Sequence, residues 1–376
     1  PPKREFRCSW LTTVWAIDWP VSHSRTDAAG QQKQQEELIA IVDSLAKANM
    51  NAVLFQVRGF SDAMYNSKYE PWSKYLTGTR GKAPSYDPLA LLVDYAHYKG
   101  IEVHVWLNPY RYASSSDTYG KNHEKDYHNT HPEWLVDCGG ITILNPALPE
   151  VREQICNVVA DIVEKYDIDG VIFDDYFHQS GYKDAYDDVQ YNAYKDTASS
   201  VMSRADWRRA QNNLMIRMVN DTIKAIKPWV RFGMGTFGIW TMKSKVASAY
   251  GISLPSGITG LDDYEEQACN PVEWVKGGYV DYINPQLYWP TTSSGQSYEK
   301  LVKWWGQDVC QHFSDLLPGK QKVHFFSSQS CSSNTASSEI IKQIDLNRKY
   351  LSSGYTGSVF YNTTAYLKMY SALTSR

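Results

Sequence analysis

Two adjacent carboxylates end a short apolar run near the middle of the chain. The run Gly170-Val171-Ile172-Phe173 is β-branched and aromatic, and Asp174 and Asp175 follow it directly. Such a run is typical of a buried strand, so the two acids are expected where the strand emerges. In parallel α/β proteins, catalytic groups collect at this end of the strands. Asp174 and Asp175 are therefore the first candidates for catalysis.

A pair of carboxyl groups is what the hydrolysis of a glycosidic bond requires. One group protonates the leaving oxygen, and the second acts as nucleophile or activates water. Adjacent acids can also separate their pKa values by repulsion, which keeps one of them protonated near neutral pH. We expect Asp174 to be the main catalytic group and Asp175 to tune it. For Asp175 a helix cap or a supporting hydrogen bond is an equal alternative, and the spacing does not identify the second member of the pair.

Other predicted strands end in amides, guanidinium groups and aromatic rings. These groups suit the recognition of hydroxyls and carboxylates, and flat rings stack on the apolar faces of sugars. For the two arginines among them the alternative is an ion pair with the adjacent acids, and for Tyr288 and Trp289 it is packing in the core. The candidate substrate-binding residues are Gln56, Arg58, Trp106, Asn108, Tyr110, Arg111, Tyr176, Trp240, Gln286, Tyr288 and Trp289.

The remaining polar clusters point less clearly to a site. The acid-rich segment 260–271 is expected to be a solvated loop. The histidines are scattered and the six cysteines form no C-x-x-C pair, so no transition-metal site and no cofactor are expected, and the thiols are expected to be free and buried. A weaker alternative is a metal-dependent hydrolase that uses Asp174 and Asp175 as ligands for Ca²⁺ or Mg²⁺.

Composition narrows the class of partner. The chain has 38 basic and 41 acidic residues without a basic stripe, so nucleic acid is not an expected partner. It has 27 Tyr and 13 Trp, which favours a carbohydrate polymer or oligosaccharide as the ligand. No apolar run is long enough to span a bilayer. The numbered chain opens without Met, so the removal of a targeting segment is expected.

Strand-like runs alternate with amphipathic helical patterns along the whole chain. Eight strands are predicted at 6–14, 52–57, 102–107, 170–174, 231–236, 279–287, 322–327 and 358–361. Helices are predicted between them at 34–48, 88–98, 150–166, 207–226, 298–313 and 339–351. This alternation predicts one domain over residues 1–376, a single (β/α)8 TIM barrel of the α/β class.

Two predicted connections are long, 108–146 after the third strand and 176–205 after the fourth. Both would lie on the catalytic face, where insertions shape a cleft. Along the fourth strand, alternate residues share a face, so Ile172 and Asp174 point one way and Phe173 and Asp175 the other. We expect Asp174 to face the barrel axis.

With these elements in place, the chain resembles the glycosyl hydrolase-like 10 family. The residues that carry the likeness include Trp10, the segments 3–7, 51–58, 166–177 and 237–240, Val105-Trp106-Leu107-Asn108-Pro109-Tyr110, and the segment 280–289. The resemblance implies a (β/α)8 barrel that hydrolyses a glycan, with peptide-free peptidoglycan strands as the leading substrate. It also implies an exported protein in the periplasm or at the cell surface, with a lipid anchor upstream of residue 1 as one means of attachment. The strand-four acids Asp174 and Asp175 fall at the family's catalytic position.

One position departs from the family pattern. Where relatives carry Asp before Pro ahead of the sixth strand, this chain reads Cys269-Asn270-Pro271. An amide cannot exchange a proton as a carboxyl group does, so Asn270 is kept as a substrate-binding candidate only. If that position supplies the second acid, the alternative is a glycan-binding barrel without activity.

Overall fold

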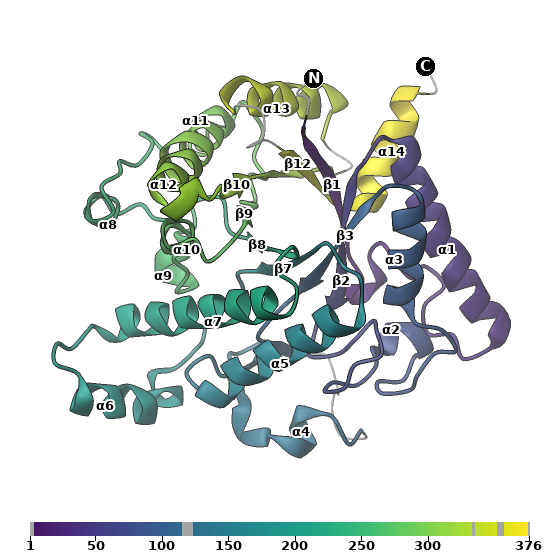
Figure 1. The fold of residues 1–376 in the computed structure, drawn as a ribbon, viewed down its shortest axis with the longest axis horizontal. Coiled ribbons are helices and arrows are strands. Elements are labelled where there is room, and N and C mark those ends of the chain that lie inside the picture. Colours follow the sequence, from purple (N-terminus) through teal and green to yellow (C-terminus); the bar gives the residue numbers. More distant parts are fainter. Residues whose placement is uncertain (1–3, 115–122, 333–334, 352–356, 375–376) are drawn as a thin grey trace.

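A sheet of parallel strands surrounded by helices forms the centre of the computed structural model (Figure 1). The structure describes residues 4–114, 123–332, 335–351 and 357–374. The strands lie in the order β10-β9-β8-β7-β3-β2-β1-β12-β11. Their bounds are β1 Phe6–Leu11, β2 Ala52–Arg58, β3 Glu102–Leu107, β7 Gly170–Asp174, β8 Arg231–Gly235, β9 Tyr282–Ile283, β10 His324–Phe325, β11 Ser327–Ser330 and β12 Gly357–Tyr361.

The sheet closes on itself through an interrupted strand. β10 pairs with β9 on one side, and β11 pairs with β12 on the other. Phe326 alone separates β10 from β11, so the two segments form one strand of the ring. The nine segments therefore make eight barrel strands, and the predicted (β/α)8 barrel is confirmed.

The inside of the barrel is filled with side chains. Glycines on two strands make room for large neighbours: a Cβ at Gly233 would lie 2.1 Å from the Tyr282 ring, and one at Gly170 would lie 2.4 Å from His104 Nδ1. A second and larger core lies between the strands and the helices. The interior cluster consists of Phe6, Cys8, Trp10, Ala52, Leu54, Trp106, Ile172, Tyr282, Phe326 and Val359.

Helices cover the outside of the ring, among them α1, α3, α5 and α7 (Figure 1). Local sequence explains their starts: Asp87 caps α3 by accepting hydrogen bonds from the Leu89 and Ala90 amides, with Pro88 at the first helical position. The bounds are α1 Ala28–Lys47, α2 Lys74–Thr77, α3 Pro88–Tyr98, α4 Tyr127–Thr130, α5 Pro149–Lys165, α6 Asp188–Thr197, α7 Arg204–Ile226, α8 Ser244–Ala249, α9 Asp263–Glu266, α10 Pro271–Gly277, α11 Tyr298–Lys303, α12 His312–Leu316, α13 Ser337–Tyr350 and α14 Thr363–Thr374.

Two predicted elements are modified in the structure. The sixth barrel strand is shorter than predicted because Pro285 has no amide hydrogen for the ladder, and pairing resumes only as an isolated bridge at Gln286. The predicted helix 298–313 is α-helical only in α11, and a π-helical segment, Trp304–Gln311, connects it to α12. That segment buries two adjacent indoles, Trp304 and Trp305.

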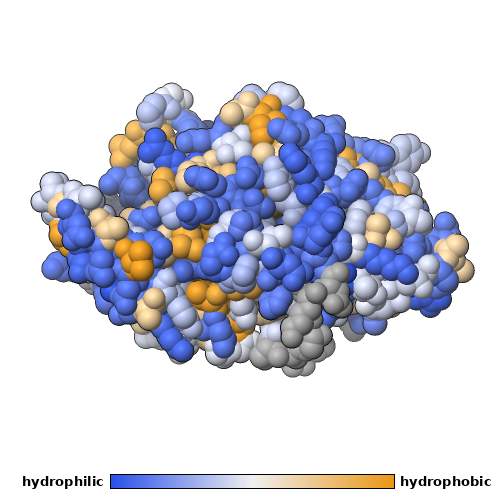
Figure 2. Space-filling model, turned by 90° about the horizontal axis from the view of Figure 1, so that it is seen from below, coloured by the Kyte–Doolittle hydropathy of each residue, from blue (hydrophilic) through white to orange (hydrophobic). Residues whose placement is uncertain are grey.

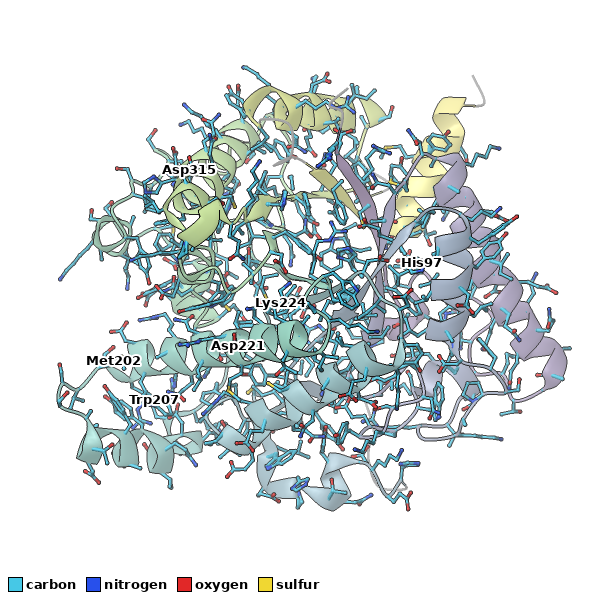
Figure 3. The ribbon with its side chains drawn as sticks, in the orientation of Figure 1. His97, Met202, Trp207, Asp221, Lys224 and Asp315 are labelled. Carbon is cyan, nitrogen blue, oxygen red and sulfur yellow. The ribbon has the colours of Figure 1, made fainter. Side chains whose placement is uncertain are left out.

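Both long connections carry structure of their own. The first holds a small antiparallel sheet in the order β4-β6-β5, with β4 Arg111–Ser114, β5 Leu135–Asp137 and β6 Ile141–Leu144. Its segment 115–122 lies outside the described residues. The second holds α6, where Trp207 of α7 lies between the two helices (Figure 3) with its ring 5.6 Å from that of Tyr191.

The face seen in Figure 2 is mostly hydrophilic, with small scattered apolar patches. Within the described residues, no helix combines the length and the apolar character that a bilayer span needs.

Candidate active site at the carboxyl ends of the strands

Asp174 is the last residue of β7 and is held from one side only. Its Oδ2 accepts hydrogen bonds from Trp106 Nε1 at 3.0 Å and from Asn108 Nδ2 at 2.6 Å. Its Oδ1 is buried and has no partner among the described residues. Ile172, on the same face of the strand, belongs to the barrel-interior cluster, so Asp174 faces the barrel axis as the alternation predicts.

The surroundings of Asp174 hold its proton near neutral pH. Burial raises the pKa of the Asp174 carboxyl to about 7, while the Arg111 guanidinium and the two N–H donors oppose that rise. A carboxyl group with this pKa is present in both protonation states at pH 7. It can therefore give a proton to a leaving oxygen and recover one afterwards.

Two predicted sugar-binding amides instead position Asp174. Gln56 Nε2 donates to Asn108 Oδ1 at 2.8 Å, and Gln56 Oε1 accepts from the Thr13 and Val14 amides at 3.0 and 2.9 Å. Both amide groups are buried, and the oxygen and nitrogen of each take part in these hydrogen bonds. Gln56 and Asn108 are therefore corrected from sugar contacts to a relay that ties the ends of β1 and β2 to the acid. Trp106, also largely buried, holds Asp174 through its indole N–H.

The prediction that Arg58 contacts substrate is wrong, as is its alternative pairing with Asp174 or Asp175. Arg58 is 2% exposed and forms a two-pronged ion pair with Glu70, at 2.6 and 2.7 Å. Its remaining donors reach Ser61 Oγ and the carbonyl oxygens of Asn108 and Pro109. Because all five N–H groups are used, the side chain joins the ends of β2 and β3 and cannot bind a ligand.

Three further candidates lie in the core rather than in the barrel mouth. Tyr110 is fully buried, and its ring packs edge-on against Phe177. Trp240 is 1% exposed and donates its indole N–H to Asn270 Oδ1 at 3.1 Å. Asn270 in turn donates to the Tyr250 hydroxyl at 2.6 Å. The structure therefore contradicts substrate contact for Tyr110, Trp240 and Asn270.

The remaining candidates form a half-buried wall at the carboxyl ends of the strands. The Arg111 guanidinium lies 3.8 Å from the centre of the Tyr176 ring. Tyr288 stacks on Tyr361 at 5.7 Å. The Trp289 ring lies over Gly238 and leaves no room for a Cβ there, and Gln286 is half-buried beside the same glycine. The charge of Asp174 acts on Tyr176, Tyr288 and Tyr361 and raises the pKa of each hydroxyl, although burial is the larger cause.

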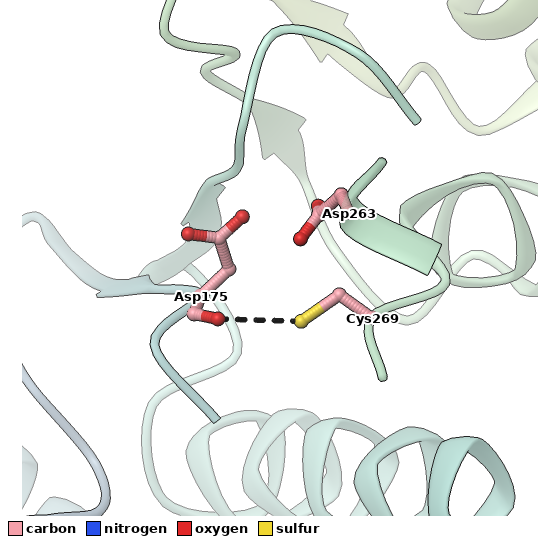
Figure 4. Close-up of side chains that lie close together, drawn as sticks. All are labelled: Asp175, Asp263 and Cys269. Atoms are coloured by element: carbon pink, nitrogen blue, oxygen red, sulfur yellow. Dashed lines mark hydrogen bonds between the residues drawn. The ribbon is translucent and has the colours of Figure 1, made fainter. Parts of the chain in front are cut away.

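Asp175 points away from the axis and meets a second acid (Figure 4). Its Oδ2 accepts a hydrogen bond from the Phe237 amide at 2.5 Å. Asp263, at the start of α9, is 0% exposed, and neither of its carboxyl oxygens accepts a hydrogen bond from any described residue, although Asp175 and the Cys269 thiol lie beside it. Burial raises the pKa of Asp175 to about 7, and burial together with the charge of Asp175 raises the pKa of Asp263 well above its ordinary value. Both carboxyl groups are therefore biased towards their protonated forms.

The sequence did not predict the role of Asp263. The expectation of a solvated loop is wrong for Asp262 and Asp263, which are both buried. A usable local signal was the spacing Asp262-x-x-Glu265, which is typical of a helix start, and Asp262 does cap α9 by accepting from the Glu265 amide. That pattern predicts the helix but not the contact of Asp263 with Asp175, which lies 88 positions earlier in the chain.

Asp175, Asp263 and Cys269 are also the one group among the described residues whose side chains could together ligate a metal, with their ligand atoms within 4.8 Å of one another. The Cys269 thiol donates to the Asp175 carbonyl oxygen at 3.4 Å, and burial raises its pKa well above the ordinary value. A metal would need the thiolate and both carboxylates. The observed hydrogen bonds instead fit a protonated cluster.

Comparison with known proteins gives a consistent result. The family model described as "Glycosyl hydrolase-like 10" matches residues 5–333. The chain is 35% identical over 351 residues to the glycosyl hydrolase YngK of Bacillus subtilis, covering 92% of this chain and 66% of YngK. It is 35% identical over 311 residues to the glycosyl hydrolase DigH of Escherichia coli K12, covering 80% of this chain and 69% of DigH. The chain thus spans about two thirds of the length of these relatives.

Solved structures share the fold. The glycoside hydrolase domain of PgaB (BpsB) from Bordetella bronchiseptica superposes with a TM-score of 0.61 at 10% identity, over 99% of this chain and 98% of that domain. An endo-β-1,4-mannanase from Thermotoga petrophila gives a TM-score of 0.52 at 13% identity, over 96% of this chain and 68% of the enzyme.

Proposed function

Because the chain belongs to the glycosyl hydrolase-like 10 family, we propose that it hydrolyses O-glycosidic bonds of a glycan, with Asp174 as the acid–base group. The observation that carries this proposal is the asymmetric environment of Asp174. One carboxyl oxygen is fixed by Trp106 and Asn108, and the other has no partner in the barrel mouth. Its pKa of about 7 suits a group that must donate and recover a proton at neutral pH.

The substrate class of the proposal is a polysaccharide, and peptide-free peptidoglycan strands are the leading candidate. The half-buried aromatic wall of Tyr176, Tyr288, Trp289 and Tyr361 supports a sugar ligand, because sugars present apolar C–H faces to such rings. A substrate of this kind goes with a periplasmic or cell-surface location.

The nucleophile that complements Asp174 could come from the protein or from the substrate. Asp175 is the carboxyl group next to Asp174 in the sequence, but it is 0% exposed and lies beside Asp263. Glycosidases acting on 2-acetamido sugars can instead use the acetamido oxygen of the substrate as nucleophile. The burial of Asp175 favours the acetamido oxygen. The anomeric carbon would then be attacked from within the substrate while Asp174 protonates the leaving oxygen.

A glycan-binding barrel without activity is the second candidate function. The observation that favours it is the burial of Asp175, which faces away from the barrel axis and leaves no second carboxyl group established beside Asp174. Asn270 no longer argues for this alternative, because its amide is occupied by Trp240 and Tyr250.

One experiment separates the two functions. The protein is incubated with peptide-free peptidoglycan strands and with other bacterial, plant and host glycans, and soluble products are identified by mass spectrometry. We expect wild type to release oligosaccharides and Asp174→Asn to be slower by about 10²- to 10⁴-fold, because proton transfer to the leaving group is lost. Glycan affinity, measured by calorimetry, should change little.

The matched control is Asp94→Asn, which removes an exposed carboxyl group on α3 that forms no hydrogen bond or ion pair with another described side chain. It should leave both readouts unchanged. Glycan binding by wild type without any product would contradict the hydrolase and support the binding barrel.

A further inference from the structure

Arg111 is a cation at the barrel mouth without a partner for its hydrogen bonds. Its side chain is half-buried, and no hydrogen bond or ion pair joins the guanidinium to any described residue. Its Nε is buried and unsatisfied. The contrast with Arg58 is direct, because Arg58, at the end of the preceding barrel strand, has every donor occupied by Glu70 and nearby oxygens.

The position of Arg111 is well defined despite the absence of a polar partner. Its backbone pairs with Ile143 in the β4–β6 ladder, and its carbonyl oxygen accepts from Ser61 Oγ at 2.9 Å. Its guanidinium carbon lies over the Tyr176 ring, 3.8 Å from the ring centre. A guanidinium on an aromatic face can still donate hydrogen bonds, because its N–H groups point outwards in its own plane.

Arg111 also lies close enough to Asp174 for its charge to act on that acid, without a hydrogen bond between the two. Removing a guanidinium partly from water costs free energy unless its N–H groups find an anion or another hydrogen-bond acceptor. Neither Asp174 nor any other described acid accepts such a bond from Arg111. The missing acceptor is therefore expected to come with the ligand.

We propose that Arg111 binds a carboxylate carried by the glycan, so that the enzyme is selective for acidic sugars. This inference rests on the proposed function, because it concerns the same site. The planar fork of a guanidinium matches the two oxygens of a carboxylate. A phosphate, with nearly twice the charge, would face one guanidinium beside an acid.

The adjacent acid is compatible with an anionic ligand. When Asp174 carries its proton as the general acid, it is neutral and does not repel a carboxylate on Arg111. Two kinds of sugar supply the group: the lactyl ether of muramic acid, which is a free carboxylate only where the stem peptide has been removed, and the C6 carboxylate of a uronic acid. The first would give selectivity for peptide-free strands.

The test compares three substrates. They are peptide-free peptidoglycan strands, the same strands with their carboxylates converted to methylamides by carbodiimide coupling, and a soluble polyuronate. We expect wild type to show a kcat/KM about 10- to 100-fold higher on the free-acid strands than on the methylamide strands, the loss typical of a charge-assisted hydrogen bond. In Arg111→Gln this ratio should fall towards one, and Arg111→Lys should restore part of it. Cleavage of the polyuronate in preference to the strands would assign the uronic acid as the source.

Arg111 also acts on the Asp174 carboxyl group through its charge, and its loss would change kcat/KM on both substrates alike. The ratio of kcat/KM on free-acid strands to kcat/KM on methylamide strands cancels that effect. Arg217→Gln, on the exposed surface of α7, is the matched control and should keep the wild-type ratio. A ratio near one in wild type, or an unchanged ratio in Arg111→Gln, would overturn the proposal.

The affinities of the free-acid and methylamide strands are measured in parallel with Asp174→Asn, because this variant is expected to leave the strands largely uncleaved. If no glycan is hydrolysed by wild type but Asp174→Asn still prefers the free acid through Arg111, the proposed hydrolase fails and carboxylate recognition stands. Equal affinities would sink the recognition of a carboxylate even where hydrolysis is found.

Discussion

At the scale of single residues, two neighbouring aspartates have different surroundings and therefore different chemistry. Asp174 faces the barrel axis with one oxygen unpartnered, whereas Asp175 faces outwards and lies beside the buried acid Asp263. The alternation of a strand is sufficient to predict that they diverge. What each acid meets depends on residues far away in the chain, such as Asn108 and Asp263.

The raised pKa values of Asp175 and Asp263 predict a pH dependence of stability. Both acids have raised pKa values in the folded protein, so above the ordinary carboxyl pKa the folded protein binds more protons than the unfolded chain. The free energy of unfolding therefore falls as pH rises from about 4 towards 7 and beyond. Asp174 contributes in the same direction, and Arg111, Asp262 and Cys269 are the other charged or titratable neighbours.

Asp263→Asn should make this dependence weaker. The amide can donate a hydrogen bond to Asp175, and one acid with a raised pKa is removed. We expect the fall in Tm between pH 5 and pH 8 to be smaller than in wild type. The slope of the free energy of unfolding against pH should be reduced by up to about 1.4 kcal/mol per pH unit. Thermal scans at four pH values measure it, with Asp94→Asn as the control. Parallel curves for Asp263→Asn and wild type would show that Asp263 does not have a raised pKa in the folded protein.

The candidate site could be predicted from the sequence only in part. Asp174, Arg111, Tyr176, Gln286, Tyr288 and Trp289 do lie together at the strand ends. Gln56, Arg58 and Asn108 lie there too, but their donors and acceptors are used within the protein. Residue type and strand position indicate that a group is near the site. They do not indicate whether another side chain has already satisfied it.

At the scale of elements, the eight barrel strands were predictable because their apolar runs are strong and regularly spaced. The strand ends were less predictable where local chemistry intervenes, as at Pro285 in the sixth strand. The closure through the split β10–β11 strand and the small β4-β6-β5 sheet depend on pairing between distant segments. No local pattern encodes that pairing.

The glycines of β7 and β8 set how closely the aromatic layer packs inside the barrel. A Cβ at Gly233 would lie 2.1 Å from the Tyr282 ring, which is backed by His104 through a 2.8 Å hydrogen bond. We expect Gly233→Ala to lower the free energy of unfolding by about 1–3 kcal/mol, the usual cost of overpacking. Denaturant unfolding measures it.

A double-mutant cycle with Tyr282→Leu tests the cause of that loss. If the clash with the ring is responsible, the alanine should cost much less when the ring is absent. An equal cost in both backgrounds would place the cause in the strand backbone instead.

At the scale of the whole molecule, the six cysteines are all free and all buried. Burial raises the pKa of several of these thiols, including Cys8, Cys269 and Cys310, so little thiolate is present at neutral pH. Thiolate is the reactive form. The fold therefore protects the thiols by packing rather than by disulfide pairing.

We expect the native protein to react very slowly with a thiol reagent such as dithionitrobenzoate, and all six thiols to react after denaturation. A reducing agent should leave Tm unchanged. Rapid labelling of the native protein would identify a thiol that opens to solvent, and a fall in Tm on reduction would reveal a disulfide.

The packed interior of the barrel also determines how a long polymer can approach. Phe6, Tyr282 and Phe326 lie within the cluster that fills the ring below Asp174. A polymer bound as proposed would not thread through the centre and would lie across the open end of the barrel. Substrate, water and both products of cleavage would then enter and leave on one side, and cleavage would need no free chain end to pass through the protein.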